Sequence, residues 1–165
     1  MISAHDFGRL QKEQHTHDLR NHFDILSRHK TDRMKHYGLH FAKYVGRLAR
    51  EPLDAKPVVR TLVDTLLVAL SAANTLHQDL SQETFTRSPA NQADYLRVFA
   101  DAAGRFADAC EKIDHMEDFV TLAKVANRDI VEWTVDAAAQ RDFNLATAVT
   151  SRREELAARQ FYIEG

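Results

Sequence analysis

Four polar side chains near residue 40 follow one face of a predicted helix. His36, His40, Lys43 and Arg47 are spaced by four, three and four residues, which places them in one stripe along that helix. Cations in such a stripe can form an ion pair with a facing carboxylate, and Asp64 in the next apolar segment is the expected partner. The same cations can bind an anionic ligand such as a phosphate. These five residues are therefore candidate ligand-binding residues.

Acidic side chains repeat at helical spacing later in the chain. Asp101, Asp108 and Glu111 share one predicted helix, and Asp129 and Glu132 share the next. Steps of three and seven residues place each group on one helix face. Carboxylate oxygens are the ligands that Mg²⁺ prefers, so these five residues are candidate metal ligands if the two faces meet. The alternative is a solvated helix surface with local ion pairs.

Histidines are concentrated at the start of the chain, where seven of the nine lie within the first forty residues. His36 and His40 can face one ion from a helix, but two ligands do not make a site and no third is evident nearby. Glu111, Asp114 and His115 form another candidate metal group. For both sets the alternative is a partly exposed helix surface.

The elements that must position these residues are predicted to be helices. Met34, Tyr37 and Phe41 begin an apolar stripe with steps of three and four residues, and residues 58–76 form a nearly continuous apolar run rich in alanine and leucine. Strand-like alternation is absent from the sequence. The prediction is an all-α bundle of about six main helices, in a single domain over residues 1–165.

Two clusters of loop-forming residues divide the helices, at residues 50–57 ("REPLDAKP") and 86–92 ("TRSPANQ"). Asn144 is the expected N-cap of the last helix.

Composition narrows the classes of partner. The net charge is −2 with neutral histidines, whereas a protein that contacts many nucleic-acid phosphates is usually basic. Cys110 is the single cysteine, so a disulfide within the chain is excluded and a reducing, cytoplasmic location is expected. The N-terminus does not have the apolar core of a signal peptide, and no apolar run reaches the length of about 20 residues that spans a bilayer. We expect neither a nucleic-acid nor a membrane partner.

An internal repeat is indicated by two pairs of segments that align without a gap. "YGLHFAKYVGRLA" (residues 37–49) matches "YLRVFADAAGRFA" (95–107), and "DTLLVALSAANTLHQDL" (64–80) matches "DIVEWTVDAAAQRDFNL" (129–145). The predicted halves are residues 31–82 and 91–161. The alignment places Gly46 on Gly104 and Asp64 on Asp129. Small residues at the repeated positions favour a close approach of two helix backbones.

This pattern resembles the MazG-like family of all-α nucleoside triphosphate pyrophosphohydrolases. The resemblance covers residues 35–80 and, more weakly, 95–162, where "DFNLATAVTSRREELAARQFY" (142–162) is similar to the closing segment of the family. In the family one helix carries E-E-x-x-E, with glycine just before the last glutamate, and the next carries E-x-x-D. The resemblance implies that acids at these positions hold Mg²⁺, which binds the triphosphate and activates water.

This chain departs from the family at most of the acidic positions. In the first half they are occupied by Lys43, Tyr44, Arg47, Thr61 and Asp64. In the second half they are occupied by Asp101, Ala102, Arg105, Ala126 and Asp129. Arginine stands at the last glutamate position of both halves, and a guanidinium cannot ligate Mg²⁺ because it has no acceptor. The usual metal site is therefore absent or rebuilt.

Two functions follow from this departure, and the sequence does not identify a catalytic residue. The first is a non-catalytic helical protein that binds a nucleotide or another small anion, in which Arg47 pairs with Asp64 and Arg105 pairs with Asp129. Arg105 thereby joins the candidate ligand-binding residues. The second is a Mg²⁺-dependent pyrophosphohydrolase that uses the acids of the second half. MazG-like proteins commonly form dimers or tetramers, so a homo-oligomer is an expectation of the resemblance, although a duplicated chain does not require one.

Overall fold

The computed structural model describes residues 4–85 and 95–159, which form seven helices and no strand. The prediction of an all-α protein with about six main helices is confirmed, since six helices are long and one is a single turn. The helices are α1 (Ala4–Asn21), α2 (Phe23–Leu26), α3 (Lys30–Ala49), α4 (Val58–Leu76), α5 (Tyr95–Asp114), α6 (Val120–Gln140) and α7 (Leu145–Ala157).

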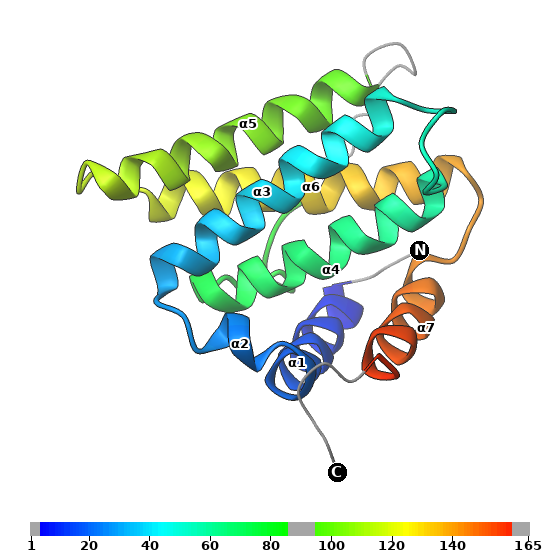
Figure 1. Cartoon of the computed structure of the whole chain (residues 1–165), viewed down its shortest axis with the longest axis horizontal. Coiled ribbons are helices and arrows are strands. Elements are labelled where there is room, and N and C mark those ends of the chain that lie inside the picture. The colour runs from blue at the N-terminus through cyan, green and yellow to red at the C-terminus, as the bar shows by residue number, and fades with distance from the viewer. Residues whose placement is uncertain (1–3, 86–94, 160–165) are drawn as a thin grey trace.

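The four longest helices form a bundle to which two further helices are added. Helix α3 packs against α4 and α5, and α6 packs against the same two helices, so these four close a ring. Helices α1 and α7 contact each other and both pack on α4, as Figure 1 shows below the bundle. Helix α4 therefore lies between the bundle and the α1–α7 pair.

This central place explains the apolar sequence of α4. Thirteen residues of the helix are buried, including Leu62, Leu66 and Leu70 with no exposed surface. A helix that is apolar on most sides is expected to be surrounded by other elements. By length and hydropathy α4 is also a candidate membrane span, but 72% of its most apolar window is buried inside the protein.

The predicted boundaries near the site agree with the structure. The loop at residues 50–57 separates α3 from α4. Asn144 is the N-cap of α7, and its side-chain oxygen accepts a hydrogen bond from the backbone N–H of Thr147 at 3.1 Å. The second predicted loop, at residues 86–92, lies outside the described residues.

The role expected for the two aligned glycines is wrong. A Cβ atom at Gly46 would meet only its own neighbour Arg50, at 3.1 Å from the guanidinium, and one at Gly104 would meet no described atom within 4 Å. The glycine at a helix contact is Gly38, where a Cβ would lie 3.4 Å from Cys110 Sγ and 3.7 Å from Phe106 Cδ1 of α5. Close approach of α3 therefore occurs two turns earlier than the repeat suggested.

The charged residues at aligned positions of the two halves make equivalent ion pairs, whereas the aligned glycines do not make equivalent helix contacts. Arg47 of α3 pairs with Asp64 of α4 at 3.6 Å, and Arg105 of α5 pairs with Asp129 of α6 at 2.9 Å. Both expected ion pairs are therefore confirmed. The repeat itself stays a prediction, and its halves include residues outside the described ranges.

We predict that leucine at the two glycines will act in opposite ways. Gly38→Leu should lower the free energy of unfolding by about 1–3 kcal/mol, because the added atoms overpack the contact with α5. Gly104→Leu is the size-matched control at an exposed helix position. There the replacement of glycine should raise the free energy of unfolding by about 0.5–1 kcal/mol. Denaturant unfolding measures both. Equal midpoints for the two variants would contradict the assignment of Gly38 to the helix contact.

Candidate functional site

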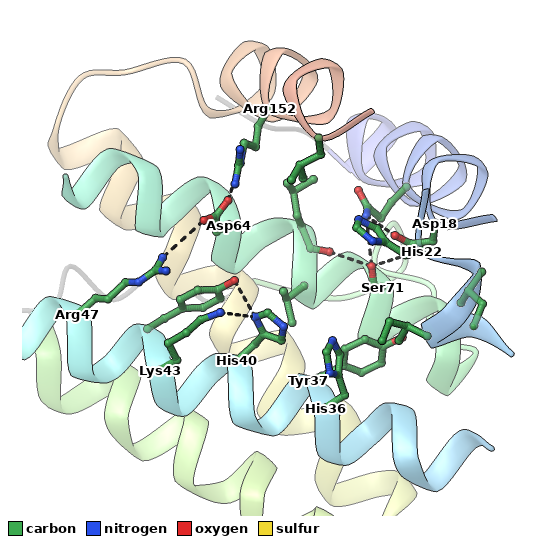
Figure 2. Close-up of a pocket in the computed structure, with 17 residues that line it drawn as sticks. Asp18, His22, His36, Tyr37, His40, Lys43, Arg47, Asp64, Ser71 and Arg152 are labelled. Carbon is green, nitrogen blue, oxygen red and sulfur yellow. Dashed lines mark hydrogen bonds and ion pairs between the residues drawn. The ribbon is translucent and has the colours of Figure 1, made fainter. Parts of the chain in front are cut away.

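A pocket of about 250 Å³ opens where α1, α2, α3, α4 and α7 meet. Figure 2 shows it with the cations of α3 and α7 at one end and the side chains of α1 at the other. Three cations line the first end (Lys43, Arg47 and Arg152), and three buried polar residues line the second (Gln14, Asp18 and Ser71). The two ends therefore differ in charge.

Asp64 organises the cationic end. Its carboxylate accepts a hydrogen bond from Arg152 Nε at 2.8 Å and lies 3.6 Å from Arg47 Nη1 and 4.0 Å from Arg60 Nε. Glu155 contacts both Arg60 and Arg152, at 2.8 and 3.0 Å. Three arginines thus share two carboxylates, and Lys43 adds a fourth cation to the same end. This end carries two more cations than carboxylates.

Arg47 is incompletely satisfied. Its Nη1 atom is buried, and it makes no hydrogen bond within the described part of the chain because Asp64 lies beyond hydrogen-bonding distance. Arg105, at the aligned position of the second half, makes direct contacts of 2.9 Å with both Asp101 and Asp129. A buried donor without an acceptor is costly, and a bound anion would supply the acceptor that Arg47 needs.

A histidine and a tyrosine hold the lysine in place. Lys43 Nζ donates to His40 Nδ1 at 2.9 Å, so His40 must be neutral with its proton on Nε2. The hydroxyl of Tyr44 lies 3.1 Å from the same nitrogen. Lys43 Nζ and Arg47 Cζ lie 4.9 and 5.4 Å from the centre of the Tyr44 ring, within the range of cation–π contacts.

Burial and like charges shift the pKa values at this end of the pocket. Burial is the main cause that lowers the pKa of His40 to about 3, and the charge of Lys43 acts in the same direction. Burial and then the charge of Arg47 lower the pKa of Lys43, whereas Asp64 raises it. The two side chains therefore lie in a region that disfavours additional positive charge, and an anion would relieve this.

The second end of the pocket is built around a buried carboxylate. Asp18 is only 5% exposed, and it accepts hydrogen bonds from Ser71 Oγ at 2.6 Å and from Gln14 Nε2 at 2.8 Å. Arg153 Nε donates to the amide oxygen of Gln14 at 2.9 Å and so fixes its orientation. Burial raises the pKa of the Asp18 carboxyl, and the hydrogen bond from Ser71 partly opposes this shift.

The structure brings five of the six predicted ligand-binding residues to one pocket. These are His36, His40, Lys43, Arg47 and Asp64. Arg105 lies elsewhere, between α5 and α6, where it is engaged by Asp101 and Asp129. That the five residues bind a ligand stays a prediction.

Sequence reasoning missed the half of the pocket contributed by α1, α2 and α7. The missed polar residues there are Gln14, Asp18, His22 and Arg152, and Ser71 of α4 was missed as well. Gln14 and Asp18 are four residues apart, which places them on one helix face, but that spacing alone does not indicate that α1 packs beside Ser71. The pairing of Arg152 with Asp64 joins residues 88 positions apart and has no local signal.

The predicted metal ligands are not brought together. Asp101 and Asp129 both contact Arg105, so a guanidinium lies between the two carboxylates that the metal would need. Glu111 contacts His115 at 2.9 Å, Asp114 contacts Lys35 at 2.6 Å, and Asp108 is exposed. Glu132 lies on α6, part-buried. Within residues 4–85 and 95–159 no three acidic, histidine or cysteine side chains are arranged to hold a metal ion. This arrangement does not fit Mg²⁺ as the resemblance places it.

Comparisons with protein-family models, curated proteins and solved structures found no match to this chain. The resemblance to the MazG-like family therefore stays a prediction.

We predict that removal of the Asp64 carboxylate will destabilise the protein strongly. Asp64→Ala should cost about 3 kcal/mol, because it leaves partly buried arginines from α3 and α7 without their acceptor. In double-mutant cycles the coupling of Asp64 with Arg152 should exceed its coupling with Arg47, as the distances of 2.8 and 3.6 Å imply. Asp101→Ala is the control, since that side chain is 64% exposed and should cost less than about 1 kcal/mol. A similar loss in both alanine variants would contradict the prediction.

We predict a measurable dependence of stability on the protonation of His40. The pKa of His40 is lowered to about 3 in the folded protein, so below about pH 6.5 only the unfolded chain takes up the proton. The contribution of neutral His40 is therefore complete above about pH 6.5 and is lost as the pH falls toward 3. The slope of unfolding free energy with pH should be smaller in His40→Gln, by up to about 1.4 kcal/mol per pH unit.

The raised pKa of Asp18 acts in the opposite direction. It is present in both proteins, so it cancels in a comparison of wild type with His40→Gln. Identical slopes between pH 6.5 and 4 would refute the assignment of the shift to His40.

Proposed function

We propose that this protein binds a small anionic ligand of the nucleotide class in the pocket between α3, α4 and α7. The observation that carries the proposal is the buried Nη1 atom of Arg47, which has no hydrogen-bond acceptor among the described residues. A ligand phosphate between Arg47, Lys43 and Arg152 would supply charge-assisted hydrogen bonds to all three cations. It would also offset the excess of cations over carboxylates at this end.

The walls of the pocket support a ligand with a flat, largely apolar part. Tyr37 and Tyr44 of α3 line the pocket together with Leu67 and Val68 of α4, and Ile25 of α2 adds an apolar side chain. Ligand pockets typically combine such walls with a few polar groups that fix orientation. A base and its sugar fit this description better than inorganic phosphate alone does.

The alternative is the Mg²⁺-dependent pyrophosphohydrolase that the resemblance implies. No observation at the pocket favours it. In the second half Asp101 and Asp129 bind Arg105, and the acids among the described residues do not converge on a common point. Binding without metal-dependent hydrolysis is therefore the better-supported function.

The binding proposal is tested by calorimetric titration of the full chain with nucleoside mono-, di- and triphosphates. Arg47→Gln should weaken the binding of every nucleotide that binds by about tenfold, or about 1.4 kcal/mol, because one charged donor to the phosphate is lost. Arg105→Gln is the matched control: it removes an arginine at the aligned position outside the pocket and should leave affinity unchanged. The proposal fails if no nucleotide binds, or if both variants bind as the wild type does.

The hydrolase alternative is tested separately by pyrophosphate release from nucleoside triphosphates with Mg²⁺ and with Mn²⁺. We expect no release above the background without protein. If the protein releases pyrophosphate and both Asp101→Ala and Asp129→Ala abolish this activity, the protein is instead a hydrolase that uses the acids of the second half.

A further inference from the structure

We propose, on the basis of the proposed function, that the pocket selects a guanine nucleoside monophosphate, with the phosphate at the Lys43–Arg47–Arg152 end and the base hydrogen-bonded to Asp18. Three features of the pocket support this assignment: the chemistry of the acidic end, the distance from that end to the cationic end, and the size of the space between them.

Asp18 has unused capacity to accept hydrogen bonds. Each of its oxygens accepts one bond from the protein, Oδ2 from Ser71 Oγ and Oδ1 from Gln14 Nε2. A carboxylate oxygen has two lone pairs, so one remains on each atom. Asp18 forms no ion pair within the described residues, although it is only 5% exposed. His22 and Arg153 act electrostatically on this buried carboxylate without forming an ion pair with it. Additional donors would stabilise it, and because Asp18 lines the pocket a ligand can supply them.

The two ends of the pocket are separated by the length of a nucleotide. Asp64 and Ser71, which anchor the two ends, are seven residues apart on α4, so they lie on one face about 10.5 Å apart along the helix axis. Figure 2 shows Asp64 beside the cations and Ser71 beside Asp18. An extended nucleoside monophosphate has a comparable span from its phosphate to the far edge of its base.

The volume favours one phosphate over three. At about 250 Å³ the pocket lies just below the range of about 300–1,000 Å³ that is usual for sites of drug-sized ligands. A monophosphate nearly fills such a space. The two further phosphates of a triphosphate would need room beyond this volume.

The hydrogen-bonding pattern of the base selects guanine. Burial favours the protonated form of Asp18, whereas hydrogen-bond donors of a bound base would favour the ionised form. The ionised carboxylate only accepts hydrogen bonds, so the base edge that it prefers has two adjacent N–H donors. Guanine presents N1–H and its 2-amino group side by side. Hypoxanthine keeps N1–H and lacks the amino group, whereas the amino groups of adenine and cytosine stand beside an acceptor nitrogen that a carboxylate repels. Uracil has one N–H between two carbonyl oxygens.

The inference is tested by calorimetric titration of the wild-type full chain with guanosine, inosine and adenosine monophosphates, with guanosine triphosphate and with guanosine. Guanosine monophosphate should bind at least fivefold more tightly than the inosine analogue, which lacks one donor, and at least tenfold more tightly than adenosine monophosphate. Guanosine triphosphate and guanosine should each bind at least tenfold more weakly than the monophosphate. These comparisons do not depend on a variant that must fold.

Asp18→Asn and Ser71→Ala then locate the base. Asp18→Asn replaces one acceptor oxygen by a donor, so the ratio of guanosine to adenosine monophosphate affinity should fall to near one. Ser71→Ala should lower the same ratio less, because the carboxylate remains. Circular dichroism of each variant checks that the fold is retained.

The outcomes separate this inference from the proposed function. Equal affinities for all three monophosphates, weakened alike by Arg47→Gln, would overturn the guanine assignment and leave the proposed function standing. Absence of binding by every nucleotide would overturn both. A guanine preference that survives in folded Asp18→Asn would overturn the placement of the base.

Discussion

The burial of α4 is the constraint on which the rest of the structure depends. This helix packs against α3, α6, α1 and α7, and several of its polar side chains have their partners on these helices. Asp64 contacts Arg47 of α3 and Arg152 of α7, whereas Ser71 donates to Asp18 of α1. Asn74 donates to the backbone carbonyl of Gln11 in α1 at 3.0 Å. These contacts set how the neighbouring helices are placed around α4, and the pocket is the space left between them (Figure 2).

The sequence predicts the features of this arrangement that depend on nearby residues or on the spacing of residues along a helix. Helical periodicity identified α3 and α4, and the loop at residues 50–57 and the cap at Asn144 follow from residue types. The pairing of Arg47 with Asp64 followed from the alignment of two helix pairs. The contact of Asp18 with Ser71 could not be predicted from the sequence, because it depends on how α1 packs against α4 and joins residues 53 positions apart.

The glycines show why an aligned position does not guarantee a shared role. Gly46 and Gly104 occupy the same register, but the contact between α3 and α5 is made at Gly38, where the small residue accommodates Cys110 and Phe106. Which face of a helix meets its neighbour is decided by the whole apolar stripe. A single glycine at a repeated position does not determine which face of the helix makes the contact.

The two aligned ion pairs differ because α7 packs on α4. Between α5 and α6, Arg105 contacts both carboxylates directly at 2.9 Å and its charge is balanced there. Between α3 and α4, Arg152 of α7 takes the direct contact with Asp64, and Arg47 is left 3.6 Å away with a buried nitrogen that lacks an acceptor among the described residues. The same residue pair thus makes a direct contact between one pair of helices and leaves a buried donor without an acceptor between the other pair, among the described residues. The packing of α7 on α4 is therefore what distinguishes the surroundings of Arg47 from those of Arg105.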